Sequence, residues 1–329
     1  MNSIMLKKIG VVSFWLILAL LFAALVIALL LYFYPKTIAS LQSANPQPKD
    51  FDESVTAIET KQNEDKLRSD VREECLPIAK LHDKKTDKAV VMLHGISACP
   101  EQFDALADTF FEAGYNVYIP RVPHHGLEDN RRHAHITLDE IGSFLEETAS
   151  IMSGLGDDVG AVGLSGGANM ATWLVQRTDI FTRALLLSPF YEPSLRYVPK
   201  WKVPFMMTLY GRDMLPNYFN GELAVNAVAK YTLLGKNYDP ELRAPQLDHI
   251  AVVTSELDDD IDLSLAHTTA RQLHTVNDTT FAETRLTRDF GVQHDIVHPD
   301  APGVSQHQEQ LYQLYFDMYE NTKPKADEE

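Results

Sequence analysis

Residues 159–167 read Val-Gly-Ala-Val-Gly-Leu-Ser-Gly-Gly, and this stretch indicates the fold class. It is an apolar run that ends in a G-x-S-x-G pattern centred on Ser165, and residues 168–176 continue with a helical composition. A serine at the apex of a strand-to-helix turn needs neighbours with almost no side chain, and the N-terminus of the helix directs free N–H groups at its oxygen. The stretch therefore predicts a nucleophilic serine. The alternative is a glycine-rich turn that carries only a surface serine.

Further apolar runs predict more strands of the same kind. Besides 159–164, short apolar runs occupy residues 88–93, 116–119, 184–187 and 250–254. Helical patterns lie between them, at residues 102–113, 138–152 and 168–177. Strands that alternate with helices predict an α/β fold with a mainly parallel sheet and helices on both faces. In such sheets the reacting groups are expected at the carboxyl ends of the strands.

The N-terminus predicts a membrane anchor. Residues 9–33 carry no charge and are rich in Leu, Ile, Val, Ala and Phe. This length is sufficient to cross a bilayer core of about 30 Å. The alternative is a cleaved signal peptide, which usually has a shorter apolar region of about 7–15 residues. Lys7 and Lys8 precede the span and only Lys36 follows closely, so we expect the N-terminus in the cytoplasm and the catalytic domain outside it.

The rest of the chain divides into a linker, one domain and a tail. Residues 1–34 are the predicted anchor, 35–69 a polar linker, 70–320 a single domain, and 321–329 a disordered tail. The formal net charge of −17 argues against a nucleic acid as the main partner. The chain has two cysteines, Cys75 and Cys99, which are expected to form a disulfide on the oxidising side of the membrane.

Three motifs in order resemble the α/β-hydrolase superfamily, and most of all its carboxylesterase and monoacylglycerol-lipase-like members. They are His94-Gly95 after the first core strand, His125-Gly126 after the second, and the G-x-S-x-G pattern around Ser165. The resemblance extends from about residue 88 to the end of the domain. It implies the α/β-hydrolase fold, with an oxyanion hole formed by the backbone N–H groups of Ile96 and Gly166.

The resemblance also implies an acid after a late strand and a histidine near the C-terminus. Asp258 fits the acid position best, with Asp260 as the alternative. His294 fits the histidine position because a hydrophobic residue follows two places later, and His298 is the alternative. The acidic loop lacks the glycine turn of a calcium loop, so we expect no metal there.

Residues 189–247 between two predicted strands are longer than a simple crossover requires and are rich in aromatic residues and methionine. They predict a cap with an apolar pocket over the site. The alternative is an insertion that only packs on the core. The nearby histidines have no zinc spacing and are expected to form a polar loop at the mouth of the site: His124, His125, His133 and His135.

The expected activity is cleavage of carboxylic esters through a Ser-Asp-His triad and an acyl-enzyme, with no cofactor. The expected partners are a small-molecule or lipid ester and the membrane. An acyltransferase or a peptidase of the same fold is an alternative, and so is a binding protein without catalysis.

Overall fold

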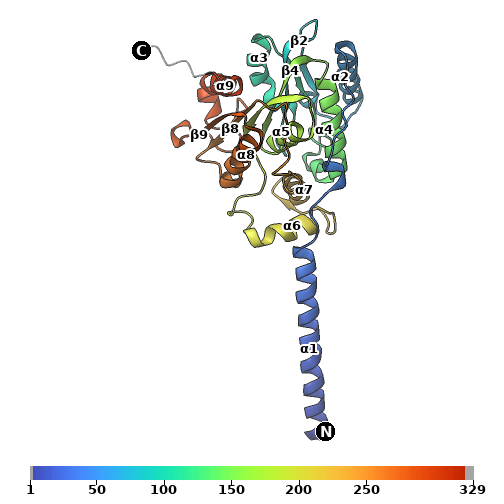
Figure 1. The fold of residues 1–329 in the computed structure, drawn as a ribbon. Coiled ribbons are helices and arrows are strands. Elements are labelled where there is room, and N and C mark those ends of the chain that lie inside the picture. Colours follow the sequence, from blue (N-terminus) through green and yellow to red (C-terminus); the bar gives the residue numbers. More distant parts are fainter. Residues whose placement is uncertain (1–2, 323–329) are drawn as a thin grey trace.

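A seven-stranded sheet forms the centre of the molecule, which a computed structural model describes over residues 3–322 (Figure 1). Its strand order is β1-β3-β2-β4-β5-β8-β9. β1 pairs antiparallel with β3, and all the other pairs in this sheet are parallel, which confirms the predicted sheet. The strands are β1 (Ile78–Lys80), β2 (Thr86–Leu93), β3 (Asn116–Ile119), β4 (Gly156–Leu164), β5 (Phe181–Leu187), β8 (His249–Ser255) and β9 (Thr280–Leu286).

Helices cover both faces of the sheet. α3 (Asp104–Glu112) and α9 (Val304–Glu320) pack on one face. α4 (Leu138–Met152), α5 (Gly166–Arg177) and α8 (Leu263–Asn277) pack on the other. The central strand β4 is buried from Val159 onward, which explains its continuous apolar sequence. Short 3₁₀ helices occupy Ala39–Leu41, Glu73–Cys75, Pro100–Phe103, Asn130–His135, Lys200–Lys202 and Arg288–Phe290.

The five apolar runs in the sequence are all strands of this sheet, whereas its two outer strands were not predicted. β1 has only three residues, none of them fully buried. β9 lies at the opposite edge and mixes Thr, Glu and Arg with apolar residues. Edge strands need less apolar surface because one side has no neighbouring strand, so their sequences carry a weaker signal.

Residues 35–69, interpreted from the sequence as a linker, are packed on the body of the protein. α2 (Phe51–Lys66) begins with a capping box, in which Asp50 and Glu53 satisfy each other's backbone N–H groups, and it packs against α4. Leu41 and Ile58 are buried in the main core. The polar composition suggested a flexible tether. The few apolar residues of this segment and the capping box of α2 are nevertheless enough for it to pack on the surface of the domain.

The insertion between β5 and β8 contains two helices and a small hairpin. They are α6 (Val203–Leu209), the strand pair β6 (Phe219–Asn220) and β7 (Leu223–Ala224), and α7 (Val225–Gly235). α7 is almost entirely buried and packs against α5, the helix that begins after Ser165. The insertion therefore lies over the part of the molecule that carries the candidate nucleophile.

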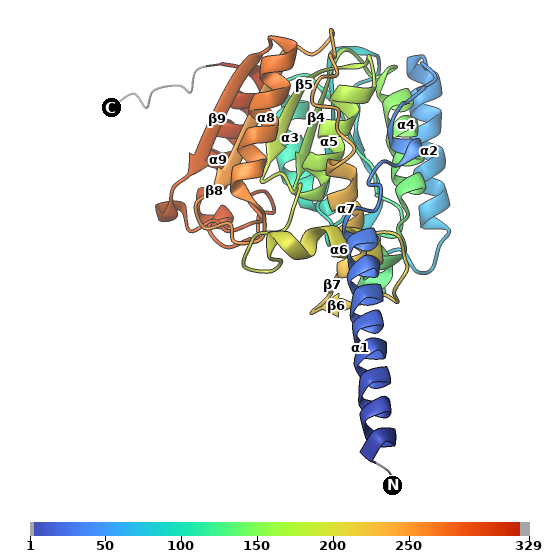
Figure 2. The same ribbon diagram turned by 60° about the horizontal axis from the view of Figure 1, so that its bottom comes forward.

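α1 (Ser3–Tyr32) projects from the body as a single long helix (Figures 1 and 2). Its residues Val11–Tyr32 are long and apolar enough to cross a membrane, and they are the one such helix among residues 3–322. Length and composition fit both a single-pass anchor and a signal sequence. Most of the tail expected to be disordered, residues 323–329, lies outside the described residues; α9 ends at Glu320.

Candidate active site

Ser165 occupies a strained turn between β4 and α5. Its φ of 56° and ψ of −118° are unusual for a residue with a side chain. Two glycines make this turn possible, because a Cβ atom at Gly163 would collide with the backbone of Gly167, and one at Gly167 would collide with the carbonyl of Leu93. The N–H of Ser165 donates to the carbonyl of Leu187 at 2.9 Å, which ties the turn to the neighbouring strand.

His294 bridges Ser165 and Asp258. Its Nε2 atom lies 2.8 Å from the Ser165 Oγ atom, and its Nδ1 atom lies 2.8 Å from an Asp258 carboxylate oxygen. Asp258 follows β8 and its side chain is fully buried, whereas the side chain of His294 is 23% exposed. Ser165 and His294 are 129 residues apart in the sequence, so the parallel sheet is what brings these groups to one edge.

The candidate residues and their alternatives make different hydrogen bonds. Among the described residues, the Nδ1 atom of His294 is hydrogen-bonded to Asp258 and not to Asp260, whose backbone N–H donates to Asp258 at 3.0 Å. His298 accepts a hydrogen bond from the N–H of Asp300 at 3.1 Å and has no contact with Ser165 among the described hydrogen bonds.

The charges in the site favour an ionised Asp258 and a basic His294. Burial alone would raise the pKa of Asp258, but the hydrogen bond and the charge of His294 outweigh it, so the pKa lies below its usual range. Burial would likewise lower the pKa of His294, but the hydrogen bond to Asp258 and the nearby charges of Asp258, Asp260 and Asp295 raise it above its usual range. The pair can therefore hold a proton received from Ser165.

Ile96 packs against Gly166, the residue that follows Ser165. A Cβ atom on Gly166 would come within 2.5 Å of the Ile96 side chain. Neither residue's backbone N–H group has a hydrogen-bond partner in the part of the chain that the structure describes, and Gly166 is the first residue of α5. Free N–H groups at the start of a helix attract negative charge. Two unpaired N–H groups, one on each side of this contact, are what the expected oxyanion hole requires.

His94 holds the loop that carries Ile96. Its Nε2 atom accepts a hydrogen bond from the N–H of Val122 at 3.1 Å, so the proton resides on Nδ1, which donates to the carbonyl of Gly95 at 3.0 Å. Burial lowers the pKa of His94 to about 4. The ring is therefore neutral at physiological pH and serves to position the loop.

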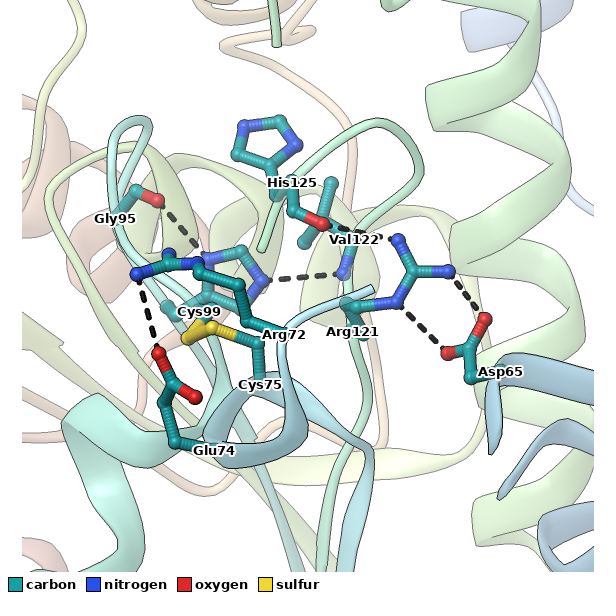
Figure 3. The surroundings of a disulfide bond; sticks show 10 residues. Asp65, Arg72, Glu74, Cys75, Gly95, Cys99, Arg121, Val122 and His125 are labelled. Carbon is teal, nitrogen blue, oxygen red and sulfur yellow. Dashed lines mark hydrogen bonds and ion pairs between the residues drawn. A yellow bond between two sulfur atoms is a disulfide. The ribbon is translucent and has the colours of Figure 1, made fainter. Parts of the chain in front are cut away.

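The chain contains the predicted disulfide between Cys75 and Cys99 (Figure 3). It joins the 3₁₀ helix Glu73–Cys75 to the loop after β2, a few residues beyond Gly95. Both cysteines are buried, and Gly126 packs directly against them, since a Cβ atom there would come within 2.6 Å of the Cys75 Cβ atom. The bridge thus fixes the segment before β1 to the loop after β2, and the loop after β3 packs against it through Gly126.

Gln102 connects the loop after β2 with the loop that carries His294, and sequence reasoning missed it. Its side-chain oxygen accepts the N–H of Gly95 at 2.9 Å, and its amide donates to Asp295 at 2.8 Å. Gln102 is only 6% exposed. In the sequence it opens a predicted helix at residues 102–113, where a glutamine carries no special signal. The helix instead begins at Asp104, after a 3₁₀ turn that turns Gln102 inward.

Two of the four histidines expected to form a polar loop are buried. His125 and His133 are 2% and 3% exposed, and their rings form a row with His94, with centroids 5.4 and 5.9 Å apart. His133 accepts the N–H of Ala224 at 3.0 Å and so holds the hairpin of the insertion. The buried His125 and His133 therefore help to pack the loops near the site.

Among residues 3–322, one cluster of possible metal ligands is present, and it consists of Asp258, Asp260 and His294. Asp258 and His294 are already hydrogen-bonded to each other, so a metal ion would have to compete for the same atoms.

Two cavities lie elsewhere in the described part of the chain. One, of about 650 Å³, is lined by the α2–α4 region, and the other, of about 960 Å³, by the α3–α9 region. Ser165 and His294 line neither, so these cavities are not the predicted apolar pocket.

The chain belongs to the alpha/beta hydrolase family. The model of that family matches residues 90–309, which include the strand-turn-helix around Ser165 and the loop of His294. No curated protein sequence matches this chain. The family assignment therefore rests on the family model together with the fold.

Solved structures of lipolytic enzymes and esterases share this fold at low sequence identity. The structure is similar to the metagenome-derived lipolytic enzymes LipS and LipT (TM-score 0.52, 17% identity, 76% of this chain and 99% of that chain). It is similar to a soluble variant of monoglyceride lipase from Saccharomyces cerevisiae (TM-score 0.56, 11% identity, 74% and 91%). It is also similar to Est1E from Butyrivibrio proteoclasticus with bound ferulic acid (TM-score 0.51, 12% identity, 74% and 94%).

Proposed function

We propose that this chain is a membrane-anchored serine hydrolase that cleaves carboxylic esters through an acyl-enzyme on Ser165. The observation that carries the proposal is the hydrogen-bond chain from Ser165 through His294 to the buried Asp258, with 2.8 Å at each step. A serine hydroxyl becomes a useful nucleophile only when an adjacent base removes its proton. This arrangement supplies that base and a carboxylate that stabilises its charged form.

The reaction follows from these positions. The Ser165 oxygen attacks the ester carbonyl carbon while His294 takes the hydroxyl proton, and the amides of Ile96 and Gly166 bind the resulting oxyanion. One such donor is typically worth about 3 kcal/mol in the transition state. The C–O bond of the ester then breaks, and His294 returns its proton to the leaving alcohol. A water molecule, deprotonated in turn by His294, releases the carboxylic acid and restores Ser165.

The anchor places this reaction at a membrane surface. We infer that α1 remains attached, with its N-terminus in the cytoplasm and the hydrolase domain on the other side. The Cys75–Cys99 disulfide supports this orientation, because structural disulfides persist on the oxidising side of the membrane.

The class of protein is tested by covalent labelling. A fluorophosphonate probe reacts only with an activated serine, so the full-length chain in native membranes is expected to gain one phosphonyl group, on Ser165. Peptide mass spectrometry locates the label, and a heat-denatured sample of the same chain serves as the control. If the native chain takes up no probe, it is a binding protein that has the fold without the activity.

The pH dependence of the reaction reports the environment of His294. Only the neutral ring accepts the Ser165 proton, and the pKa of His294 is raised by Asp258, with contributions from Asp260 and Asp295. Activity is therefore expected to fall as the pH drops through a pKa above the ordinary histidine value of about 6.5. The measurement is kcat/KM for a water-soluble ester as a function of pH.

A matched pair of variants tests whether the pH dependence of kcat/KM reports His294. Asp260→Asn removes one of the charges that raise the pKa of His294 and should move the acidic limb to lower pH. Asp259→Asn removes the neighbouring charge, which is exposed and paired with Arg196, and should leave the limb in place. An acidic limb in the unmodified chain at or below the ordinary histidine pKa would argue against His294 as the base.

A further inference from the structure

The insertion carries a concentration of exposed apolar side chains. Outside α1 and the two residues after it, most of the large apolar side chains that the described residues expose lie between 195 and 218. Trp201 is 61% exposed, Leu195 62% and Tyr218 58%. We define the cap rim as these exposed residues: Leu195, Tyr197, Trp201, Met214, Leu215 and Tyr218. Large apolar side chains exposed in this number on one insertion are typical of an interaction site.

The cap rim lies where the membrane-spanning helix enters the body. α6, which begins two residues after Trp201, packs against the C-terminal end of α1 (Figures 1 and 2). The rings of Tyr32 and Phe205 are 5.7 Å apart, and the Thr208 hydroxyl donates to the carbonyl of Leu31 at 2.8 Å. The insertion is thus the part of the hydrolase domain nearest to the end of the span.

The helix cannot swing freely away from this position. The chain after α1 is bonded to the body at several points: the N–H of Ile38 donates to Asn237 at 2.7 Å, and the Trp173 ring N–H donates to the carbonyl of Leu41 at 3.0 Å. Arg212 in the insertion also donates to the carbonyl of Pro35 at 2.7 Å. These bonds fix the distance between the end of α1 and the cap rim.

We propose that the cap rim lies in the interface of the bilayer that α1 spans, so that the active site receives acyl esters from that bilayer. Trp and Tyr are enriched at the level of the lipid headgroups, because their side chains combine an apolar ring with a polar group that can bond to water. The Lys202 ammonium lies 5.3 Å from the Trp201 ring centre, and a lysine at this depth can extend to the water.

The rim also extends to the candidate active site, and the substrate part of this inference rests on the proposed function. The N–H of Ser194 donates to the carbonyl of Asp260 at 3.0 Å, and Arg196 forms an ion pair with Asp259. Leu195 and Tyr197 therefore lie beside the loop that carries Asp258. A lipid ester that leaves the bilayer along the rim reaches the site without crossing water, which favours long-chain acyl esters as substrates.

Tryptophan fluorescence tests the position of the rim without using activity. The chain has three tryptophans, of which Trp15 is in α1 and Trp173 is fully buried. The full-length Trp15→Phe variant is placed in phosphatidylcholine vesicles with or without bromine near the glycerol end of the acyl chains. Bromine quenches on near contact, and interfacial apolar groups lie about 5–10 Å into the boundary region, so the Trp201 emission should fall about two-fold or more.

The matched control is the Trp15→Phe, Trp201→Phe variant, which should show no loss of emission on bromination. If the single and double variants respond to bromine equally, Trp201 does not touch the bilayer and the proposal is overturned. The result would then indicate that the rim faces water or a protein.

A second measurement addresses the substrate route. Full-length Trp201→Glu is compared with Leu67→Glu, which changes an exposed leucine outside the rim. For each we measure turnover of a long-chain p-nitrophenyl ester carried in vesicles relative to a water-soluble short-chain one. The ratio should fall several-fold for Trp201→Glu and remain unchanged for Leu67→Glu; equal ratios would overturn the route. Quenching of Trp201 in a chain that hydrolyses neither ester would support the membrane contact and overturn the proposed function.

Discussion

Replacement of Ser165 by alanine is expected to lower kcat for ester hydrolysis by about 10⁴–10⁶-fold and to leave the protein folded. In the proposed reaction the Oγ atom attacks the ester, and it lies 2.8 Å from the Nε2 atom of His294. Alanine has no such atom, so hydrolysis by this route ends. The turn itself should survive, because its conformation depends on Gly163 and Gly167 and on the hydrogen bond from the backbone N–H of residue 165 to Leu187.

The measurement compares kcat of the full-length variant with that of the unmodified chain on a p-nitrophenyl ester, and circular dichroism verifies the fold. Ser97→Ala is the matched control, because Ser97 is an exposed serine in the loop after β2. It should retain nearly full activity. A Ser165→Ala variant with more than about a tenth of the original activity would eliminate Ser165 as the nucleophile.

Replacement of His294 by alanine is expected to reduce kcat by a factor similar to that of the Ser165 variant, because the two residues act as a unit. Without the imidazole, no base lies within hydrogen-bond distance of the Ser165 oxygen in the described structure. Replacement of His298 should change kcat little, since that ring accepts only the N–H of Asp300. Both variants are assayed with the same soluble ester, and added imidazole is tested for partial rescue of the His294 variant.

The two histidines are good controls for each other because they are four residues apart in one loop. An inactive His298→Ala variant together with an active His294→Ala variant would reverse the assignment. Loss of activity in both variants would indicate damage to the loop and not loss of the base. Thermal unfolding of both variants tests this, because a damaged loop should lower the unfolding temperature.

The sequence alone indicated the features whose physical causes are local. A nucleophile at a strand-to-helix turn needs glycines two places before and after it, and these are visible in the pattern around Ser165. Strands buried on both faces need uninterrupted apolar residues, so the central strands were readable, whereas β9 at the edge was not. The order of the candidate serine, acid and histidine along the chain could likewise be read without coordinates.

Other features depend on contacts between residues far apart in the sequence, and only the tertiary structure decided them. The hydrogen bond of Asp258, and not of the nearby Asp260, to the Nδ1 atom of a histidine 36 residues later is one such contact, because neighbouring carboxylates look alike in a sequence. Gln102 donates a hydrogen bond to Asp295, which lies 193 residues later in the chain. No local pattern marks such a bridge, because either partner alone is an ordinary polar residue.

The N-terminal region shows the same difference between local and tertiary causes. The ability of α1 to span a bilayer is a property of its own composition, since a span needs only length and the absence of charge. The docking of residues 35–69 on the body, and of α6 on the end of α1, depends on the shape of surfaces formed by distant segments. The pattern of apolar residues shows which side of a segment can be buried. The surface against which that side packs forms only when the whole chain has folded.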